Sequence, residues 1–188
     1  FSPIPVDALT ALASESGFGP KLADGADLTH ARTLNNILGT GAGTTIGIID
    51  SGIDAKHKDF TNEKGESRIK HYEDFTEEGT DDVVGHGTHV AGIAAGNGLA
   101  SDGKLKGTAS NANIVMAKVF GVKGETDESV ILAAMKWVAQ KGVDLLNMSL
   151  GGPGAPNKDP LSAMANQLAA VDNILVVAAA GNEGPFPH

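Results

Sequence analysis

Four short and almost uninterrupted apolar runs constrain the fold of this 188-residue chain more than any other feature. They lie at residues 44–49, 114–120, 144–149 and 174–180. Apolar runs of this length without polar alternation are typical of strands buried on both faces of a parallel sheet. We therefore predict an α/β fold, with a mostly parallel sheet and helices on both of its faces.

The segments between these runs supply the predicted helices. Residues 87–95 combine small and apolar side chains, and residues 127–141 place their apolar side chains at helical spacing. Residues 160–171 form the third predicted helix. Residues 54–84 are polar and rich in loops, and only residues 68–75 within them are patterned like a strand.

Residues 1–25 differ from the rest of the chain. They are rich in Pro, Ser and Gly and show no sustained periodicity. We expect them to form an N-terminal arm that lies over a core formed elsewhere. Residues 26–188 are then one domain or the larger part of one.

Composition excludes several classes of protein. The net charge is −9, and the clustered basic residues that bind a phosphate backbone are missing, so we expect no nucleic-acid partner. The chain has no Cys, which rules out disulfides and thiol nucleophiles but does not identify the compartment. Each apolar run is far shorter than the roughly 20 residues of a membrane helix, so we expect no membrane partner.

Polar residues follow the predicted strands at the edge where parallel sheets bind ligands. Asp50 ends the first run, residues 149–152 follow the third, and Gly181 and Asn182 follow the fourth. Because the carboxyl ends of parallel strands share one edge, we expect these residues to converge. Taken singly, Asp50 is better explained as a turn residue that caps local amides.

His86 lies between two glycines in the stretch GHGTHVAG. These glycines allow close backbone approach around an imidazole at the mouth of a helix, which suits a general base. The positive end of the helix is expected to keep the resting imidazole neutral. We interpret His89 as a buried structural histidine, because this His-x-x-His pair lacks the third ligand and the Glu of a zinc protease site.

Four sequence blocks resemble the subtilisin-like serine proteases, in that family's order. They are GIIDSGID at residues 47–54, GHGTHVAG at 85–92, NMSLGG at 147–152 and AAAGNEG at 178–184. The resemblance implies that residues 26–188 are the N-terminal part of a subtilisin-like catalytic domain. It also implies a secreted serine endopeptidase that hydrolyses extended protein substrates through an acyl-enzyme.

The resemblance implies catalytic roles for three residues. Asp50 holds the imidazole of His86 in the productive tautomer and stabilises its protonated form. His86 takes the proton from a serine hydroxyl and later delivers it to the leaving amine. Asn182 donates its side-chain amide to the developing oxyanion.

The resemblance also implies two segments that flank the substrate. Ser149, Leu150 and Gly151 match the strand that pairs with an extended substrate backbone. Small residues are expected to line a roomy, unselective pocket for the residue before the scissile bond: Gly151, Gly152, Ala179, Ala180 and Gly181. Gly124 begins the second segment, residues 124–128, whose three carboxylates predict a preference for basic residues upstream of the cut.

Asp59 matches a position that often binds calcium in this family, and carboxylate oxygens suit that hard cation. The partner loop, residues 97–106, carries two lysines and differs in length from the family pattern. Structural calcium at Asp59 and a solvated turn aspartate are therefore equal alternatives.

The family's nucleophile block, Gly-Thr-Ser-x-Ala, does not follow Asn182 in this chain. Ser51 and Ser149 belong to blocks with other roles, and the Gly-Thr-Ala-Ser at residues 107–110 matches a family segment without a catalytic part. We therefore expect this chain alone to be inactive. A second polypeptide, or a C-terminal segment after His188, is expected to supply the serine and to cover the apolar edge of the last strand.

Two other interpretations remain. A catalytically inactive pseudoprotease or regulatory peptide-binding half keeps the groove without hydrolysis, but it has no chemical need for Asp50, His86 and Asn182 together. Asp50-Ser51-Gly52 also resembles half of an aspartic-protease dyad. That mechanism requires a second such carboxylate, and the sequence contains no second Asp-Ser/Thr-Gly.

Overall fold

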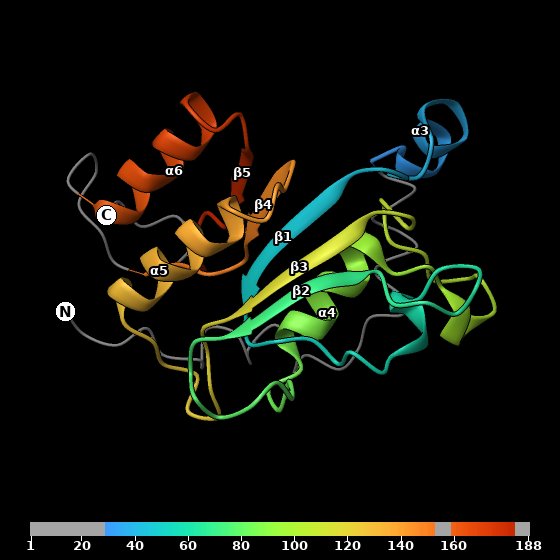
Figure 1. Cartoon of the computed structure of the whole chain (residues 1–188). Coiled ribbons are helices and arrows are strands. Elements are labelled where there is room, and N and C mark those ends of the chain that lie inside the picture. Colours follow the sequence, from blue (N-terminus) through green and yellow to red (C-terminus); the bar gives the residue numbers. More distant parts are fainter. Residues whose placement is uncertain (1–28, 153–158, 183–188) are drawn as a thin grey trace.

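The computed structural model describes residues 29–152 and 159–182, so the predicted arm lies outside the described residues. Five parallel strands form one sheet in the order β2-β3-β1-β4-β5 (Figure 1). The strands are β1 (Thr45–Asp50), β2 (Ile69–Asp74), β3 (Asn113–Lys118), β4 (Leu145–Met148) and β5 (Leu175–Ala178). The α-helices are α3 (Ala31–Leu38), α4 (His86–Ala95), α5 (Glu128–Ala139) and α6 (Pro160–Ala170), and the short 3₁₀ helices are η1 (Lys58–Phe60) and η2 (Leu99–Ser101). The predicted parallel α/β fold is confirmed.

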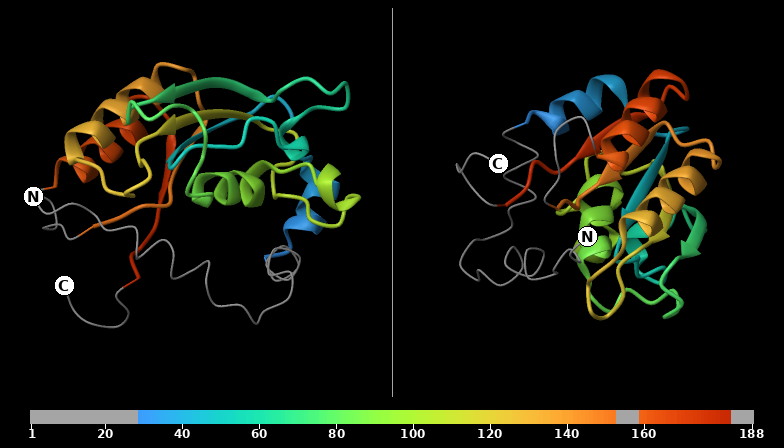
Figure 2. Two further views of the ribbon diagram at one scale, coloured as in Figure 1. Left: turned by 90° about the horizontal axis from the view of Figure 1, so that it is seen from below. Right: turned by 90° about the vertical axis from the view of Figure 1, so that its left-hand side faces the viewer.

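The sheet separates two apolar cores, because α4 packs on one of its faces and α5 on the other (Figure 2). Neighbouring residues of a strand point to opposite faces. Ile48 therefore packs in the core beneath α4, while Ile49 packs in the core beneath α5. This two-sided burial explains why the first apolar run shows no polar alternation.

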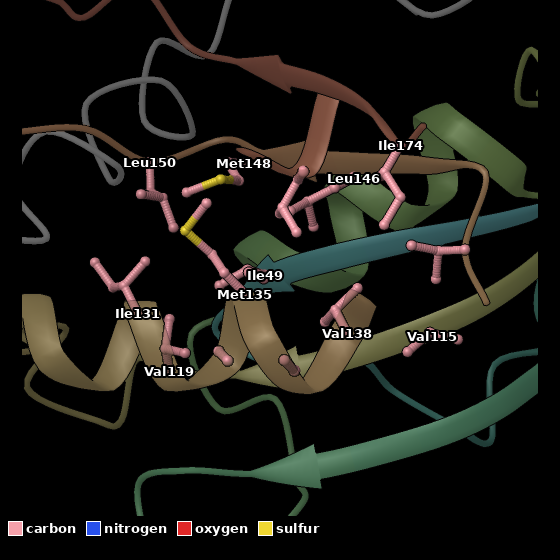
Figure 3. Close-up of a cluster of buried hydrophobic side chains, with 14 of the residues drawn as sticks. Ile49, Val115, Val119, Ile131, Met135, Val138, Leu146, Met148, Leu150 and Ile174 are labelled. Atoms are coloured by element: carbon pink, nitrogen blue, oxygen red, sulfur yellow. The ribbon is translucent and has the colours of Figure 1, made fainter. Parts of the chain in front are cut away.

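The core beneath α5 is mainly aliphatic, and most of its residues come from α5 and from β1, β3 and β4. Ile131, Met135 and Val138 of α5 point toward the sheet (Figure 3), and each is fully buried. The positions three and four residues apart place these side chains on one face of the helix. They fix the helix over the central strands, whose carboxyl ends carry Asp50 and the segment after β4.

Two elements differ from what the sequence predicts. Helix α3 was not predicted, and its apolar residues Leu34, Ile37 and Leu38 are exposed. Strand β5 was predicted as a buried strand, but within the described residues it pairs only with β4, and Leu175 is 61% exposed. In the described part of the chain, no helix has both the length and the apolar character needed to cross a membrane.

Candidate active site

The structure brings Asp50 and His86 into direct contact. Asp50 is the last residue of β1, and His86 is the first residue of α4. Their hydrogen bond joins His86 Nδ1 to Asp50 Oδ1 over 2.7 Å. Asp50 is 1% exposed and His86 is 15% exposed, so the carboxylate is enclosed while the imidazole reaches the surface.

Gly87 allows this close approach of α4 to β1. A Cβ atom at this position would lie 2.1 Å from the carbonyl oxygen of Gly52 and 3.1 Å from Cβ of Asp50. Gly85, the N-cap residue of α4, has a φ of 82°, in the left-handed region that favours glycine. Gly85 is therefore required for its backbone conformation, and Gly87 for the close approach that the sequence predicts.

The carboxylate of Asp50 raises the pKa of His86. The hydrogen bond to Asp50 is the largest cause, burial opposes it, and the charges of Asp50 and Asp82 add to it. The expectation that the helix terminus keeps the imidazole neutral is therefore wrong in direction. A full negative charge at 2.7 Å outweighs the partial positive charge of a helix end.

Asp50 has few other partners. Its Oδ1 also accepts a hydrogen bond from the backbone N–H of Ser51 at 2.7 Å. Its Oδ2 is buried and has no hydrogen-bond partner among the described residues. Because so few donors compensate this charge, it is available to stabilise a protonated imidazole on His86.

Ser51 is fully buried, and its hydroxyl is already committed to two hydrogen bonds. It donates to Asp82 Oδ1 at 2.9 Å and accepts from the backbone N–H of Gly87 at 2.9 Å. These contacts are consistent with a structural role rather than with nucleophilic attack. Asp82 was not predicted as a site residue, although it precedes α4 by only four residues, and a carboxylate just before a helix can cap it.

The predicted residues of the other strands lie at the same edge of the sheet. In register, Ile48 is the partner of Asn147 and Met148 is the partner of Ala178. Extending both pairings by the same offset places Ser149 level with Asp50, and Ala179 level with Ser149. Asn182 follows Ala179 by three residues and is exposed. The strand ends thus converge, while the catalytic role of Asn182 stays a prediction.

The predicted substrate-flanking residues differ in their burial. Leu150 points into the core beneath α5, so only its backbone is available to a peptide. The Ser149 hydroxyl accepts from Asn147 Nδ2 at 2.9 Å. The small residues predicted to line the pocket are all exposed: Gly151, Gly152, Ala179, Ala180 and Gly181.

Gly124 lies in a turn at the carboxyl end of β3. Its φ is 66°, and its N–H donates to the carbonyl of Gly121 at 2.9 Å. A hollow of about 350 Å³ opens beside this turn, and the carboxylates among its lining residues are Glu78, Glu125 and Asp127. Lys123 is the one cation among those lining residues. The second predicted segment therefore borders a mainly acidic depression.

Asp59 and His89 differ from their expected environments. Asp59 is buried rather than solvated, and its Oδ1 accepts the backbone N–H of Ala100 at 2.7 Å. The partner loop, residues 97–106, thus directs an amide donor at this oxygen. No group of three or more His, Asp or Glu that could hold a metal occurs among the described residues. His89 is exposed, so its interpretation as a buried histidine is wrong.

Comparisons with known proteins agree with this geometry. Subtilisin DY of Bacillus licheniformis is 38% identical over 144 residues, which are 77% of this chain and 49% of that protein. The minor extracellular protease Vpr of Bacillus subtilis is 32% identical over 180 residues, 92% of this chain and 22% of that protein. Among solved structures, the CspB protease of Clostridium perfringens gives a TM-score of 0.75 at 25% identity, over 85% of this chain and 41% of that one.

The chain spans half or less of the length of these relatives. A model of the Subtilase family, Peptidase S8, matches residues 41–187, which are most of this chain. That match includes Asp50, His86 and the ends of all five strands. This chain belongs to the Subtilase family.

Proposed function

We propose that the full-length protein is a serine endopeptidase and that this chain supplies its acid, its base and one oxyanion donor. The observation that carries the proposal is the 2.7 Å contact between Asp50 Oδ1 and His86 Nδ1, at the edge where β4 and β5 also end. His86 reaches the surface with its imidazole held by a buried carboxylate. This is the arrangement that general-base activation of a hydroxyl requires.

In the proposed reaction, His86 accepts the proton of a serine hydroxyl as its oxygen attacks the peptide carbonyl. Asp50 stabilises the resulting imidazolium, in line with the raised pKa of His86. The imidazolium then protonates the leaving amine, which leaves an acyl-enzyme, and water hydrolyses that ester by the same steps. The Asn182 amide donates to the oxyanion in both halves of the reaction.

The serine is proposed to come from a C-terminal segment or a second polypeptide outside residues 1–188. The exposed edge of β5 supports this proposal, because Leu175 is 61% and Val177 is 44% exposed. A further strand paired with this edge would satisfy the backbone groups of β5, and an element packed on the face to which Leu175 and Val177 point would cover these side chains. The buried, doubly bonded hydroxyl of Ser51 does not fill the role.

The proposed substrate is an extended peptide that adds to the segment after β4. The acidic hollow beside Gly124 supports a preference for Lys or Arg a few positions before the scissile bond. Secretion is part of the proposal, and it rests on the resemblance to secreted subtilases. Structural calcium at Asp59 stays part of the proposal, because a carboxylate suits that cation, although its Oδ1 atom already accepts the Ala100 N–H and no step of the mechanism depends on a metal.

The test is hydrolysis of unstructured peptides by the full-length protein. We expect the protein to cleave these peptides. A serine-directed fluorophosphonate should abolish the cleavage, and a pepstatin-like inhibitor should leave it unchanged. A His86→Ala variant should not cleave the peptides. Cleavage of Lys-containing peptides should exceed that of Glu-containing ones at low salt. A folded full-length protein that binds extended peptides without cleaving them would instead identify an inactive peptide-binding pseudoprotease.

A further inference from the structure

The loop that leads into α4 is held by a buried side chain of β3 and a partly buried side chain of β2. Lys118, which is 1% exposed at the end of β3, donates through Nζ to the carbonyls of Gly79 at 2.7 Å and Asp81 at 2.8 Å. The hydroxyl of Tyr72, on β2, donates to the carbonyl of Thr80. Burial raises the pKa of Tyr72 to about 12, so this donor keeps its proton at neutral pH. The path of the loop up to residue 82 is therefore fixed.

Asp82, at the end of this fastened stretch, accepts four hydrogen bonds. Its Oδ1 accepts from the Ser51 hydroxyl and the Gly85 N–H, each at 2.9 Å. Its Oδ2 accepts from the Thr88 N–H at 2.8 Å and from the Thr88 hydroxyl at 2.5 Å. Burial alone would raise the pKa of Asp82, but these bonds hold it below its ordinary value. The group is thus an anion fixed at the first turn of α4.

Ser51 connects this anion to both catalytic candidates. Its backbone N–H donates to Asp50, and its hydroxyl lies between Asp82 and the N–H of Gly87. Asp82 therefore bonds directly to Gly85 and to Ser51, and it is linked to Gly87 through the Ser51 hydroxyl. Asp82 accepts the N–H of Thr88 and the Ser51 hydroxyl accepts that of Gly87, so two of the N–H groups left unpaired at the start of the helix have partners.

We propose that Asp82 is a positioning residue, whose carboxylate fixes the first turn of α4 on the end of β1 and so holds His86 against Asp50. The inference rests on the proposed peptidase function. Asp82 does not touch the reacting atoms and acts through Ser51, Gly85 and Thr88. The charges that act on His86 are those of Asp50 and Asp82, while the Lys118 ammonium is directed at backbone carbonyls of the loop.

The test compares Asp82→Asn with Asp81→Asn in the full-length protein. Both variants remove one negative charge from the same loop, but the Asp81 side chain is exposed and the network passes only through its backbone carbonyl. We expect Asp82→Asn to lower kcat about tenfold with little change in KM, because a misplaced base costs rate rather than binding. It should also lower the pKa of His86, whereas Asp81→Asn should leave kcat and that pKa at their wild-type values.

The His86 pKa is measured by NMR titration of histidines labelled at Cε1, with the resonance assigned by its loss in His86→Gln. This readout does not depend on catalysis, so a failure of the proposed peptidase function and a failure of the Asp82 inference are distinguishable. A folded Asp82→Asn variant with reduced thermal stability but wild-type kcat and His86 pKa would overturn the inference. If Asp82→Asn does not fold, Ser51→Ala interrupts the same link, and an unchanged kcat in that variant would equally contradict it.

Discussion

The candidate site has two sides, one formed by β1 and α4 and the other by β4 and β5, and they differ in how far their residues are buried within this chain. On the side of β1 and α4, Asp50 is buried and His86 is held in place by its hydrogen bond to Asp50. On the side of β4 and β5, the residues after the strands are exposed, and β5 pairs only with β4 within the described residues. The proposed acid and base are thus positioned by packing inside the chain, while the proposed oxyanion donor and substrate pocket lie among exposed residues.

The strongest test of the first side is Gly87→Ala. The added Cβ would meet the Gly52 carbonyl oxygen at 2.1 Å, so α4 must move away from β1. We expect a loss of about 4 kcal/mol or more in the free energy of unfolding, together with loss of the Asp50–His86 contact. Denaturant unfolding measures this loss.

Gly92→Ala, in the same helix, is the matched control. A Cβ there meets nothing within 4 Å in the described structure, so the better helix propensity of Ala should leave stability unchanged or raise it by up to about 1 kcal/mol. If Gly87→Ala and Gly92→Ala destabilise the protein equally, the close packing of α4 on β1 does not explain the loss of stability in Gly87→Ala.

Arg68→Met tests the far end of α4. The Arg68 guanidinium is buried and donates to the carbonyls of Asp59 and Ala95, and to those of Thr61 and Ala112. Removing it leaves several buried carbonyls without a donor, and we expect a loss of about 3 kcal/mol.

Lys70→Met, two residues further along the chain in β2, replaces an exposed cation and should change the unfolding free energy by less than about 0.5 kcal/mol. If the two variants unfold at the same denaturant concentration, the guanidinium does not hold this end of the helix.

Val177→Lys tests the second side. The side chain is 44% exposed in β5, so the substitution should cost little if this edge faces solvent. If another strand covers the edge in the full-length protein, burying the ammonium should cost about 2 kcal/mol. Val171→Lys, at a site that is 75% exposed after α6, is the control and should be neutral. Equal thermal stability of both variants would contradict a covered edge.

The smallest expected effect is a pH dependence of stability. Because the folded pKa of His86 is raised above 6.5, protonated His86 stabilises the fold fully below that pH, and this contribution is lost as pH rises through the folded pKa. The stability advantage of the wild type over Asp50→Asn should therefore be larger near about pH 6 than near about pH 9. Thermal unfolding at the two pH values measures it, and an advantage that grows toward alkaline pH would contradict the proposed pair.

The apolar runs were sufficient to predict the parallel sheet, while the resemblance to the subtilisin-like proteases implied the contact of Asp50 with His86. Apolar runs without alternation and glycines around His86 express local requirements that a sequence pattern displays directly. The apolar run of residues 174–180 indicated that the last strand needs a neighbour, but it did not indicate how far each side chain of β5 is exposed, because burial of a strand depends on its neighbours in the sheet.

The network around Asp82 was also missed. Residues 73–82 contain several carboxylates, and local sequence does not indicate which of them reaches the helix terminus. The direction of the His86 pKa shift depended on a distance between residues that are 36 positions apart in the chain. The fold decides whether the helix end or the Asp50 charge has the larger effect on the pKa of His86. Neither the segment around Asp50 nor the segment around His86 indicates it alone.

The most direct test of the two-sided site is to label the full-length protein with a fluorophosphonate and to map the modified residue by mass spectrometry. We predict a single modified serine outside residues 1–188, with labelling that is lost in His86→Ala and in Asp50→Ala. Modification of Ser51 or Ser149 within this chain, or labelling that persists without His86, would contradict the account.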